Sequence, residues 1–406
     1  MGNSLLDENE NKQDLAQRDS LVVTRGKGEL LPSWEPPREL PELPTESVLR
    51  RAFAQALFQT GGIRAAERVA RWWQGRFRKA GDKRTGSVFS PKSAILCYHR
   101  IGTRGVPLYS GLPRSVFEQQ IAYLRKHYRI ISLEELLTER ESAKNNVPGV
   151  VITFDDGYAD LYSEAFPVLR QYEVPATIYL VAGAIQSGEI PWYDRIFVAF
   201  QVAPADKLMQ ELGLPDAIRL ETPKQRLVAA ARYIFTLRTL RDAERRERCD
   251  SLQRRFPLPL DPIMNRMLTW SQIREMQSAG ISFGSHTMSH PMLSKLNSRE
   301  LLYELRDSRN VIENELQRPV PDFSYPFGTW DSFNGETCAQ LAALHYRSAV
   351  SSIPGLNTEE TSPLALRRVT YCETSSLAIF AARLGRLFLS LAHDTGAVQA
   401  SRTSDS

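Results

Sequence analysis

Apolar and polar positions along the chain predict buried strands separated by amphipathic helices. The apolar runs 93–98, 150–154 and 175–181 are nearly continuous, and the last two are rich in β-branched residues, as in parallel strands covered on both faces. Helical periodicity follows at 115–127, 160–172, 269–279 and 300–317. Further strands are expected at 281–283, near Phe323, at 346–350 and at 366–370, which gives seven strands.

Strands and helices in short succession predict parallel βαβ units. We therefore expect an α/β fold, an incomplete (β/α)7 barrel at residues 93–371. Residues 188–268 instead carry long helical periods, which predict a helical insertion. This insertion begins with Trp192-Tyr193-Asp194 just after a strand end. It is either a lid over the mouth of the barrel or a peripheral helical pair.

The two ends of the chain differ from the barrel in composition. Residues 1–50 are acidic, Pro-rich and without apolar period, so we expect disorder. Residues 51–92 are basic and predict an amphipathic helix that docks on the barrel or lies on an anionic membrane. Residues 372–406 predict a C-terminal helix and tail, in which Arg383 and Arg386 interrupt the apolar stretch.

Composition narrows the class of protein. Hydrophobic residues make up 42% and charged residues 24%, as in ordinary globular chains, and the formal net charge is +4. The four scattered cysteines indicate reduced thiols.

We find no apolar signal peptide and no stretch of membrane-spanning length. These features predict a cytoplasmic protein that contacts the inner face of the membrane. No nucleic-acid motif accompanies the basic charge, so we expect no nucleic-acid partner.

Two adjacent acids end the second predicted strand. Asp155 and Asp156 follow the run Val150–Phe154 and precede Gly157. Side chains at successive strand positions point to opposite faces, so both carboxylates reach one site only if the chain turns there, which Gly157 permits. Strand ends are where α/β folds hold their chemistry. These acids are therefore candidate functional residues.

A histidine pair supplies what two carboxylates lack. His286 and His290 are four residues apart, which would place them on one face of a helical turn. Two imidazoles and one carboxylate form a three-ligand site with open positions, as in catalytic Zn²⁺ sites and in Fe²⁺ sites with two histidines and one carboxylate. We expect a divalent metal, with Zn²⁺ first. The turn at Pro326, Phe327 and Gly328 offers backbone N–H groups for an oxyanion.

The segments T-F-D-D-G-Y and S-H-T-x-x-H, followed by Pro-Phe-Gly, resemble the polysaccharide deacetylase family (NodB homology, carbohydrate esterase family 4). The resemblance implies that Asp155 is the general base and that Asp156, His286 and His290 bind the metal. It also implies that Phe327 donates its N–H to the oxyanion. Pro326, Gly328 and Tyr158 would complete the oxyanion and substrate region.

The chain departs from the family pattern at two points. Ser324 stands where the family usually has an arginine that steadies the base, and no Leu-x-His within residues 93–371 supplies the usual acid. Deacetylases of poly-N-acetylglucosamine, which this chain resembles at Tyr98-His99, also have a strand-final Tyr-His pair near the metal. An acid acting near neutral pH suits histidine. We therefore predict that His99 protonates the leaving amine.

The resemblance implies a metal-dependent N-deacetylase that acts on an N-acetylated sugar in polysaccharide or lipid-linked glycan biosynthesis. Two alternatives remain at this point. The missing arginine is compatible with hydrolysis of another non-peptide C–N bond, such as that of a cyclic amide. The basic N-terminal segment is compatible with a catalytically weak partner of polysaccharide assembly at the membrane surface.

Overall fold

The computed structural model describes residues 93–102, 111–142, 149–214, 218–256, 267–370, 372–374 and 376–390. The predicted disordered segment 1–50, the predicted basic helix 51–92 and the tail after residue 390 lie outside these residues. Within the described part of the chain, none of the helices has the length and apolar character needed to cross a bilayer.

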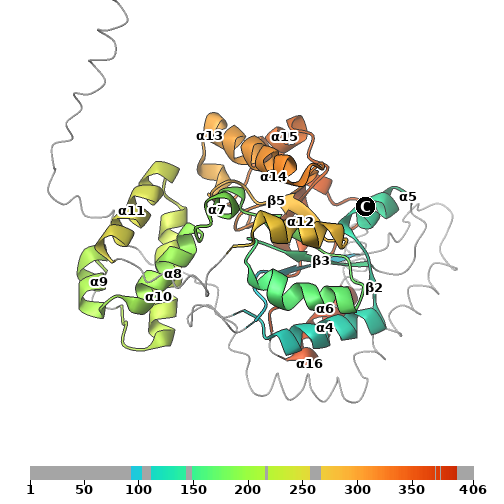
Figure 1. The fold of residues 1–406 in the computed structure, drawn as a ribbon, viewed down its shortest axis with the longest axis horizontal. Helices are drawn as coiled ribbons and strands as arrows, with labels where there is room; N and C mark the ends of the chain where they lie inside the picture. The colour runs from blue at the N-terminus through green and yellow to red at the C-terminus, as the bar shows by residue number, and fades with distance from the viewer. Residues whose placement is uncertain are drawn as a thin grey trace, which may run out of the picture.

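A parallel sheet forms the centre of the molecule (Figure 1). Its strands are β1 (Ala94–Tyr98), β2 (Arg129–Ile130), β3 (Gly149–Phe154), β4 (Thr177–Leu180), β5 (Ser282–Ser285), β6 (Asp322–Ser324), β7 (Ser348–Pro354) and β8 (Leu366–Arg368). They pair in the order β1-β3-β4-β5-β6-β7-β8, and β2 pairs with β3. Val369, just after β8, returns to β1: its N–H donates to Ile95 O at 2.8 Å, and it accepts from Cys97 N at 3.0 Å. The sheet is thereby nearly closed into a barrel.

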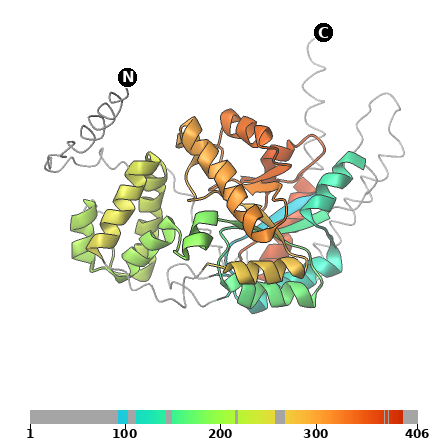
Figure 2. The ribbon, with the colours of Figure 1, turned by 45° about the horizontal axis from the view of Figure 1, so that its top comes forward.

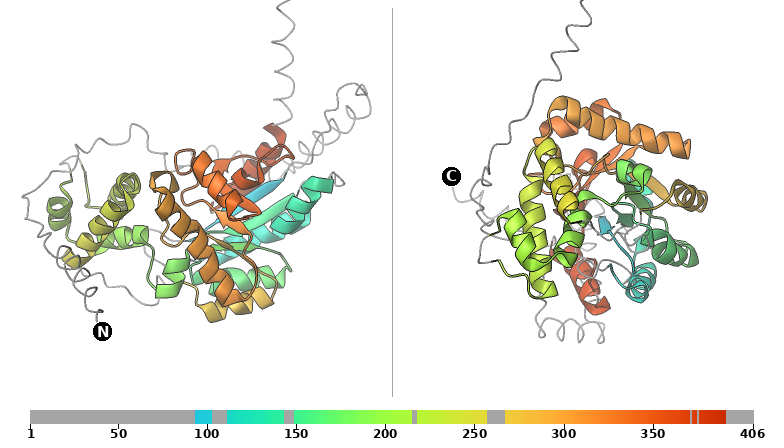
Figure 3. Two further views of the ribbon diagram at one scale, coloured as in Figure 1. Left: turned by 90° about the horizontal axis from the view of Figure 1, so that it is seen from above. Right: turned by 60° about the vertical axis from the view of Figure 1, so that its left-hand side comes forward.

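Helices surround the barrel, as the turned views in Figures 2 and 3 show. They are α4 (Arg114–His127), α5 (Leu133–Ser142), α6 (Phe166–Gln171), α7 (Ala182–Ser187), α12 (Trp270–Ser278), α13 (Ser298–Leu302), α14 (Ser308–Leu316), α15 (Gly335–Ala343) and α16 (Leu377–Ser390). The largest apolar core lies between the sheet and helices such as α4 and α16. Apolar residues that recur on one helix face account for this packing.

The predicted (β/α)7 barrel is confirmed, with one addition. The short strand β2 raises the number of strands in the sheet to eight. Two residues carry too little apolar pattern to predict a strand. A capping box precedes α5, because Ser132 Oγ accepts from Glu135 N at 3.0 Å while Ser132 N donates to the Glu135 carboxylate at 2.7 Å.

The helical insertion forms a lobe at the left of the barrel in Figures 1 and 2. Its helices are α8 (Trp192–Val202), α9 (Ala205–Leu212), α10 (Pro223–Arg238) and α11 (Asp242–Arg255). They enclose a core of their own that includes Ile196, Phe200 and Tyr233. Phe327, from the turn after β6, packs against this core. The lobe therefore meets the barrel at the carboxyl ends of the strands.

Candidate active site

A tight turn at the end of β3 brings both acids to one place. Asp156 adopts a positive φ of 73°, and Gly157 N donates to Asp155 O at 2.9 Å. Positive φ is uncommon for a residue with a side chain. The turn ends the strand alternation, and both carboxylates lie near His286: Asp155 Oδ2 is 4.0 Å and Asp156 Oδ1 3.7 Å from its Nε2.

The predicted helical turn at the histidine pair is wrong. His286 directly follows β5, and residues 286–292 form a loop rather than a helix. Thr287 and His290 have φ values of 69° and 55°, and Thr287 Oγ1 accepts from His290 N at 2.9 Å. The ring centroids of His286 and His290 still lie 4.8 Å apart. The i, i+4 spacing thus brings the rings together through backbone strain, which proteins concentrate at functional sites.

Asp156, His286 and His290 fit a metal ion. Asp156 Oδ1 lies 3.7 Å from His286 Nε2 and 3.8 Å from His290 Nε2. Two ligands of a tetrahedral Zn²⁺ with bonds of about 2.0–2.1 Å stand roughly 3.4 Å apart, so small side-chain movements suffice. A carboxylate and two imidazoles in this arrangement suit Zn²⁺ and similar divalent cations.

The charge states also suit metal binding. Burial, together with the neighbouring His286 and Arg245, lowers the pKa of His290 well below its usual value, which favours the neutral imidazole that binds metals. His286 Nδ1 lies 2.7 Å from Ser324 O. If this nitrogen donates to the carbonyl, Nε2 keeps its lone pair and faces Asp156. Burial raises the pKa of Asp156, and a bound cation would reverse that effect.

Arg368 occupies the role left open by Ser324. Its guanidinium, which is fully buried, donates from Nη1 to Asp155 Oδ1 at 2.8 Å and from Nη2 to Asp155 Oδ2 at 2.6 Å. Nη2 also donates to Ser324 Oγ at 3.1 Å, and Ser324 Oγ lies 3.3 Å from Asp155 Oδ2. Burial alone would raise the pKa of Asp155, but Arg368 outweighs it and holds that pKa well below the usual range. Asp155 is therefore ionised at neutral pH.

Sequence reasoning missed Arg368. It lies on β8, 44 residues after Ser324, so no local motif contains both. The available signal was a charged residue inside a predicted barrel strand, because a buried cation requires a carboxylate partner. Since the arginine–carboxylate pair is present, the arginine missing at position 324 no longer indicates a different substrate.

His99 follows β1 and lies beside the acids. Its side chain is 31% exposed, and its Nδ1 lies 3.3 Å from Glu373 Oε1, which also accepts from the His99 backbone N–H at 2.7 Å. Burial disfavours the charged ring, but the charge and hydrogen bond of Glu373, with smaller contributions from Asp156 and Asp155, raise the pKa of His99 to about 9. The ring therefore holds its proton at neutral pH. Glu373 lies after the predicted end of the barrel and was not identified from sequence.

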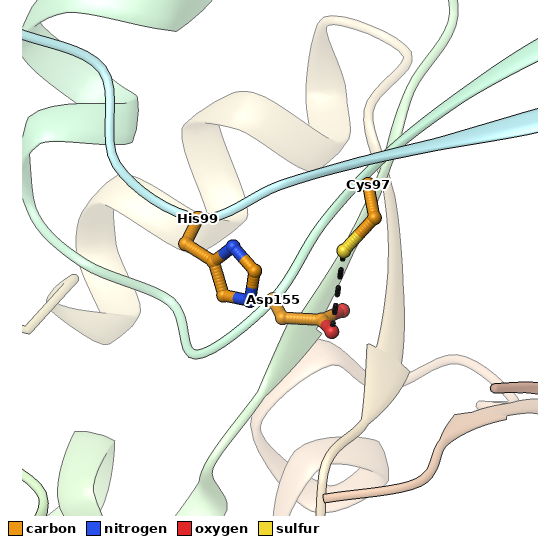
Figure 4. Close-up of side chains that lie close together, drawn as sticks. All are labelled: Cys97, His99 and Asp155. Atoms are coloured by element: carbon orange, nitrogen blue, oxygen red, sulfur yellow. Dashed lines mark hydrogen bonds between the residues drawn. The ribbon is translucent and has the colours of Figure 1, made fainter. Parts of the chain in front are cut away.

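Cys97, His99 and Asp155 form a second group of potential metal ligands (Figure 4), with one ligand atom of each within 4.8 Å of the others. The Cys97 thiol points to Asp155 Oδ2 at 3.7 Å. However, Arg368 already engages both Asp155 oxygens, and burial raises the pKa of Cys97 well above its usual value. A cation there would face a guanidinium and a protonated thiol, so this group does not fit a metal.

The Pro326–Gly328 turn stands at the edge of the metal-ligand group. Phe327 has a φ of 60°, and its ring centroid lies 4.9 Å from that of His290. Gly328 N donates to Pro326 O at 2.7 Å. A Cβ on Gly328 would meet the backbone N of Ser352 at 2.4 Å, so only glycine fits there. The turn thus holds the Phe327 backbone beside the predicted ligands.

Tyr158 links the segment after β3 to helix α8. It is fully buried, and its hydroxyl donates to Asp194 Oδ2 at 2.8 Å. The Arg100 guanidinium lies over its ring, 4.6 Å from the centroid. Tyr158 has no exposed face for the substrate contact expected from sequence, so we place it in the support of the site.

Comparisons with known proteins point to one family. The family model described as polysaccharide deacetylase matches residues 142–349. YxkH of Bacillus subtilis, named for the same family, is 24% identical over 293 residues, which cover 72% of this chain and 75% of YxkH. The poly-beta-1,6-N-acetyl-D-glucosamine N-deacetylase of Staphylococcus epidermidis is 34% identical over 125 residues, but the match spans 27% of this chain and 43% of that protein.

The fold comparison agrees with the observed barrel. The structure of the deacetylase PplD of Streptococcus pyogenes, in complex with acetate, superposes with a TM-score of 0.50 and 20% identity over 74% of this chain and 99% of PplD. At this identity the similarity concerns the fold. The family match over half of the chain identifies this protein as a member of the polysaccharide deacetylase family, whose members are hydrolases acting on carbon–nitrogen bonds.

Proposed function

We propose that this chain is a metal-dependent N-deacetylase that removes acetyl groups from an N-acetylated sugar of a polysaccharide or lipid-linked glycan. The observation that carries the proposal is the convergence of Asp156, His286 and His290 beside the Asp155–Arg368 pair. Similarity to the staphylococcal enzyme supports N-acetylglucosamine in β-1,6 linkage as the first polymer to test.

Each group has a distinct task in amide hydrolysis. Asp156, His286 and His290 would hold a divalent cation, which would supply the Lewis acid needed at the acetamide carbonyl. Asp155, kept ionised by Arg368, takes the proton of the attacking water. The Phe327 backbone N–H stabilises the negative charge that develops on the carbonyl oxygen. His99 gives its proton to the nitrogen of the departing amine.

The alternative of a catalytically weak barrel gains no support from the site. Four of the seven non-glycine residues with positive φ in the described chain lie here: Asp156, Thr287, His290 and Phe327. Such strain persists when the surrounding structure is built to hold it, as at active sites. A barrel kept only as a binding partner has no need of it.

We expect one divalent cation per chain, lost when His286 or His290 is replaced by alanine. Removing one of three protein ligands eliminates a direct metal bond, which weakens binding more than any change to surrounding residues. Metal content after dialysis and acetate release with and without chelator provide the measurements. His345→Ala serves as the control, because His345 is exposed and is not one of the three predicted ligands. Wild-type metal content in both ligand variants would exclude this site.

Glu373→Gln is expected to move the basic limb of the pH–rate profile to lower pH. The glutamate charge raises the pKa of His99 to about 9, and its removal lowers that pKa, so the proton needed by the leaving amine is lost earlier as pH rises. A cation bound to Asp156 would cancel the contribution of that carboxylate to the pKa of His99. We therefore expect the basic limb of the wild-type pH–rate profile below pH 9. The exposed Glu360→Gln is the control. An unchanged limb would separate Glu373 from the acid.

A further inference from the structure

The helical insertion is attached at both of its ends to the segment that follows β3 and contains Asp156. At its beginning, Tyr193 Oη donates to Asp156 Oδ1 at 2.7 Å, while the barrel residue Tyr158 donates to Asp194 Oδ2 at 2.8 Å. The donor of one bond is in α8 and the donor of the other is in the segment after β3, and the two α8 residues are adjacent in sequence. At its end, Leu268 N donates to Gly157 O at 2.9 Å. Both ends of the insertion therefore contact Asp156 or the residues next to it.

The same lobe also holds the second histidine. Trp192 Nε1 donates to His290 O at 3.1 Å, and Arg245 Nη1 donates to the same oxygen at 3.2 Å. Arg245 is buried, and its guanidinium lies 4.7 Å from the centre of the Trp192 ring. His290 has a strained backbone, with a φ of 55°. Two donors on its carbonyl stabilise that conformation, since each charged or neutral hydrogen bond resists rotation of the peptide.

From these contacts we infer that the insertion is a working part of the metal site and that Tyr193 is a positioning residue for Asp156. This rests on the proposed metal-binding function. The Asp156 oxygen that receives the Tyr193 hydroxyl is the one that faces both His286 Nε2 and His290 Nε2. A carboxylate oxygen has lone pairs for both a metal and one hydrogen-bond donor. Tyr193 thus fixes the carboxylate in the orientation that the metal requires.

The placement of Tyr193 makes this role specific. Its ring centroid lies 4.7 Å from that of His290, and the ring packs at the edge of the insertion core. Because the ring packs against both His290 and the insertion core, the Tyr193 side chain loses little conformational freedom when its hydroxyl bonds to Asp156. Residues that hydrogen-bond to metal ligands typically contribute 10–100-fold to metal affinity. We expect a contribution in that range from the Tyr193 hydroxyl.

The test compares Zn²⁺ affinity of the full chain, measured by competition with a chromophoric chelator, in wild type, Tyr193→Phe, Tyr233→Phe and His286→Ala. Tyr193→Phe should keep one Zn²⁺ per chain with a dissociation constant raised about 10–100-fold. Tyr233→Phe removes a hydroxyl from the same lobe away from the ligands, and should bind as wild type. Melting curves without metal establish that both variants are folded.

The outcomes separate the inference from the proposed function. If wild type binds Zn²⁺, His286→Ala does not, and Tyr193→Phe binds as tightly as wild type, the role of Tyr193 is overturned and the metal site stands. If wild type binds no Zn²⁺, or His286→Ala binds it normally, the proposed function itself fails. Equal weakening in Tyr193→Phe and Tyr233→Phe would also overturn the inference, because the effect would then belong to the packing of the lobe.

Discussion

Replacing His99 with alanine is expected to lower turnover roughly 10²–10⁴-fold, the usual range for general acid catalysis. Amine departure from the tetrahedral centre requires a proton, and His99 lies beside Asp155 with its proton held by Glu373. The basic limb of the pH–rate profile should disappear with the ring. Metal content should not change, because His99 is outside the Asp156, His286 and His290 group.

The leaving group provides a sharper test of this role. An acetyl ester with a stable phenolate leaving group needs no protonation, so His99→Ala should retain most of its activity on such a substrate, whereas Asp155→Asn should lose activity on both. His127→Ala, on α4, is the control for a general loss of stability. If His99→Ala turned over the N-acetyl substrate within a few-fold of wild type and with the same pH profile, another group would have to be the acid.

Replacing Arg368 with methionine is expected to destabilise the fold by about 3–5 kcal/mol, the usual cost of removing one partner from a buried ion pair. Asp155 would then be left as a buried carboxylate without its guanidinium. Denaturant unfolding gives the free energy of unfolding, and acetate release gives the turnover, which should fall with it. Arg367→Met is the control, since that neighbouring arginine is exposed.

The pH dependence of stability tests the same pair. The folded-state pKa of Asp155 lies below that of an unfolded aspartate, about 3.9. The stability from its ionisation is therefore fully present above that pH and is lost as pH falls towards the folded-state value. Arg368→Met should show less of this acid loss than wild type. If the variant unfolded like wild type at neutral pH and in acid, the ion pair would not stabilise the fold.

Local sequence determined much of the barrel. Apolar runs such as 150–154 predict strands because a strand buried on both faces needs uninterrupted apolar residues. The predicted strands also place Asp155, Asp156 and His286 at strand ends, because these residues come soon after a strand in the sequence. The conformation of the histidine loop was not predictable in this way. The positive φ values at Thr287 and His290 occur where the loop contacts distant segments: Ala182 N of α7 donates to Thr287 O, and Trp192 and Arg245 of the insertion donate to His290 O.

Tertiary structure alone decided which distant residues complete the site. Arg368, Glu373 and Tyr193 come from the last strand, the segment after it and the insertion, and each reaches its partner across a large separation in sequence. A motif records only residues at fixed spacing, whereas closure of a barrel brings its first and last strands together. The sequence by itself thus determined the chemistry at the strand ends. Closure of the sheet and attachment of the lobe determined the charge of the base, the proton on His99 and the orientation of the Asp156 carboxylate, because burial and hydrogen bonding control these properties.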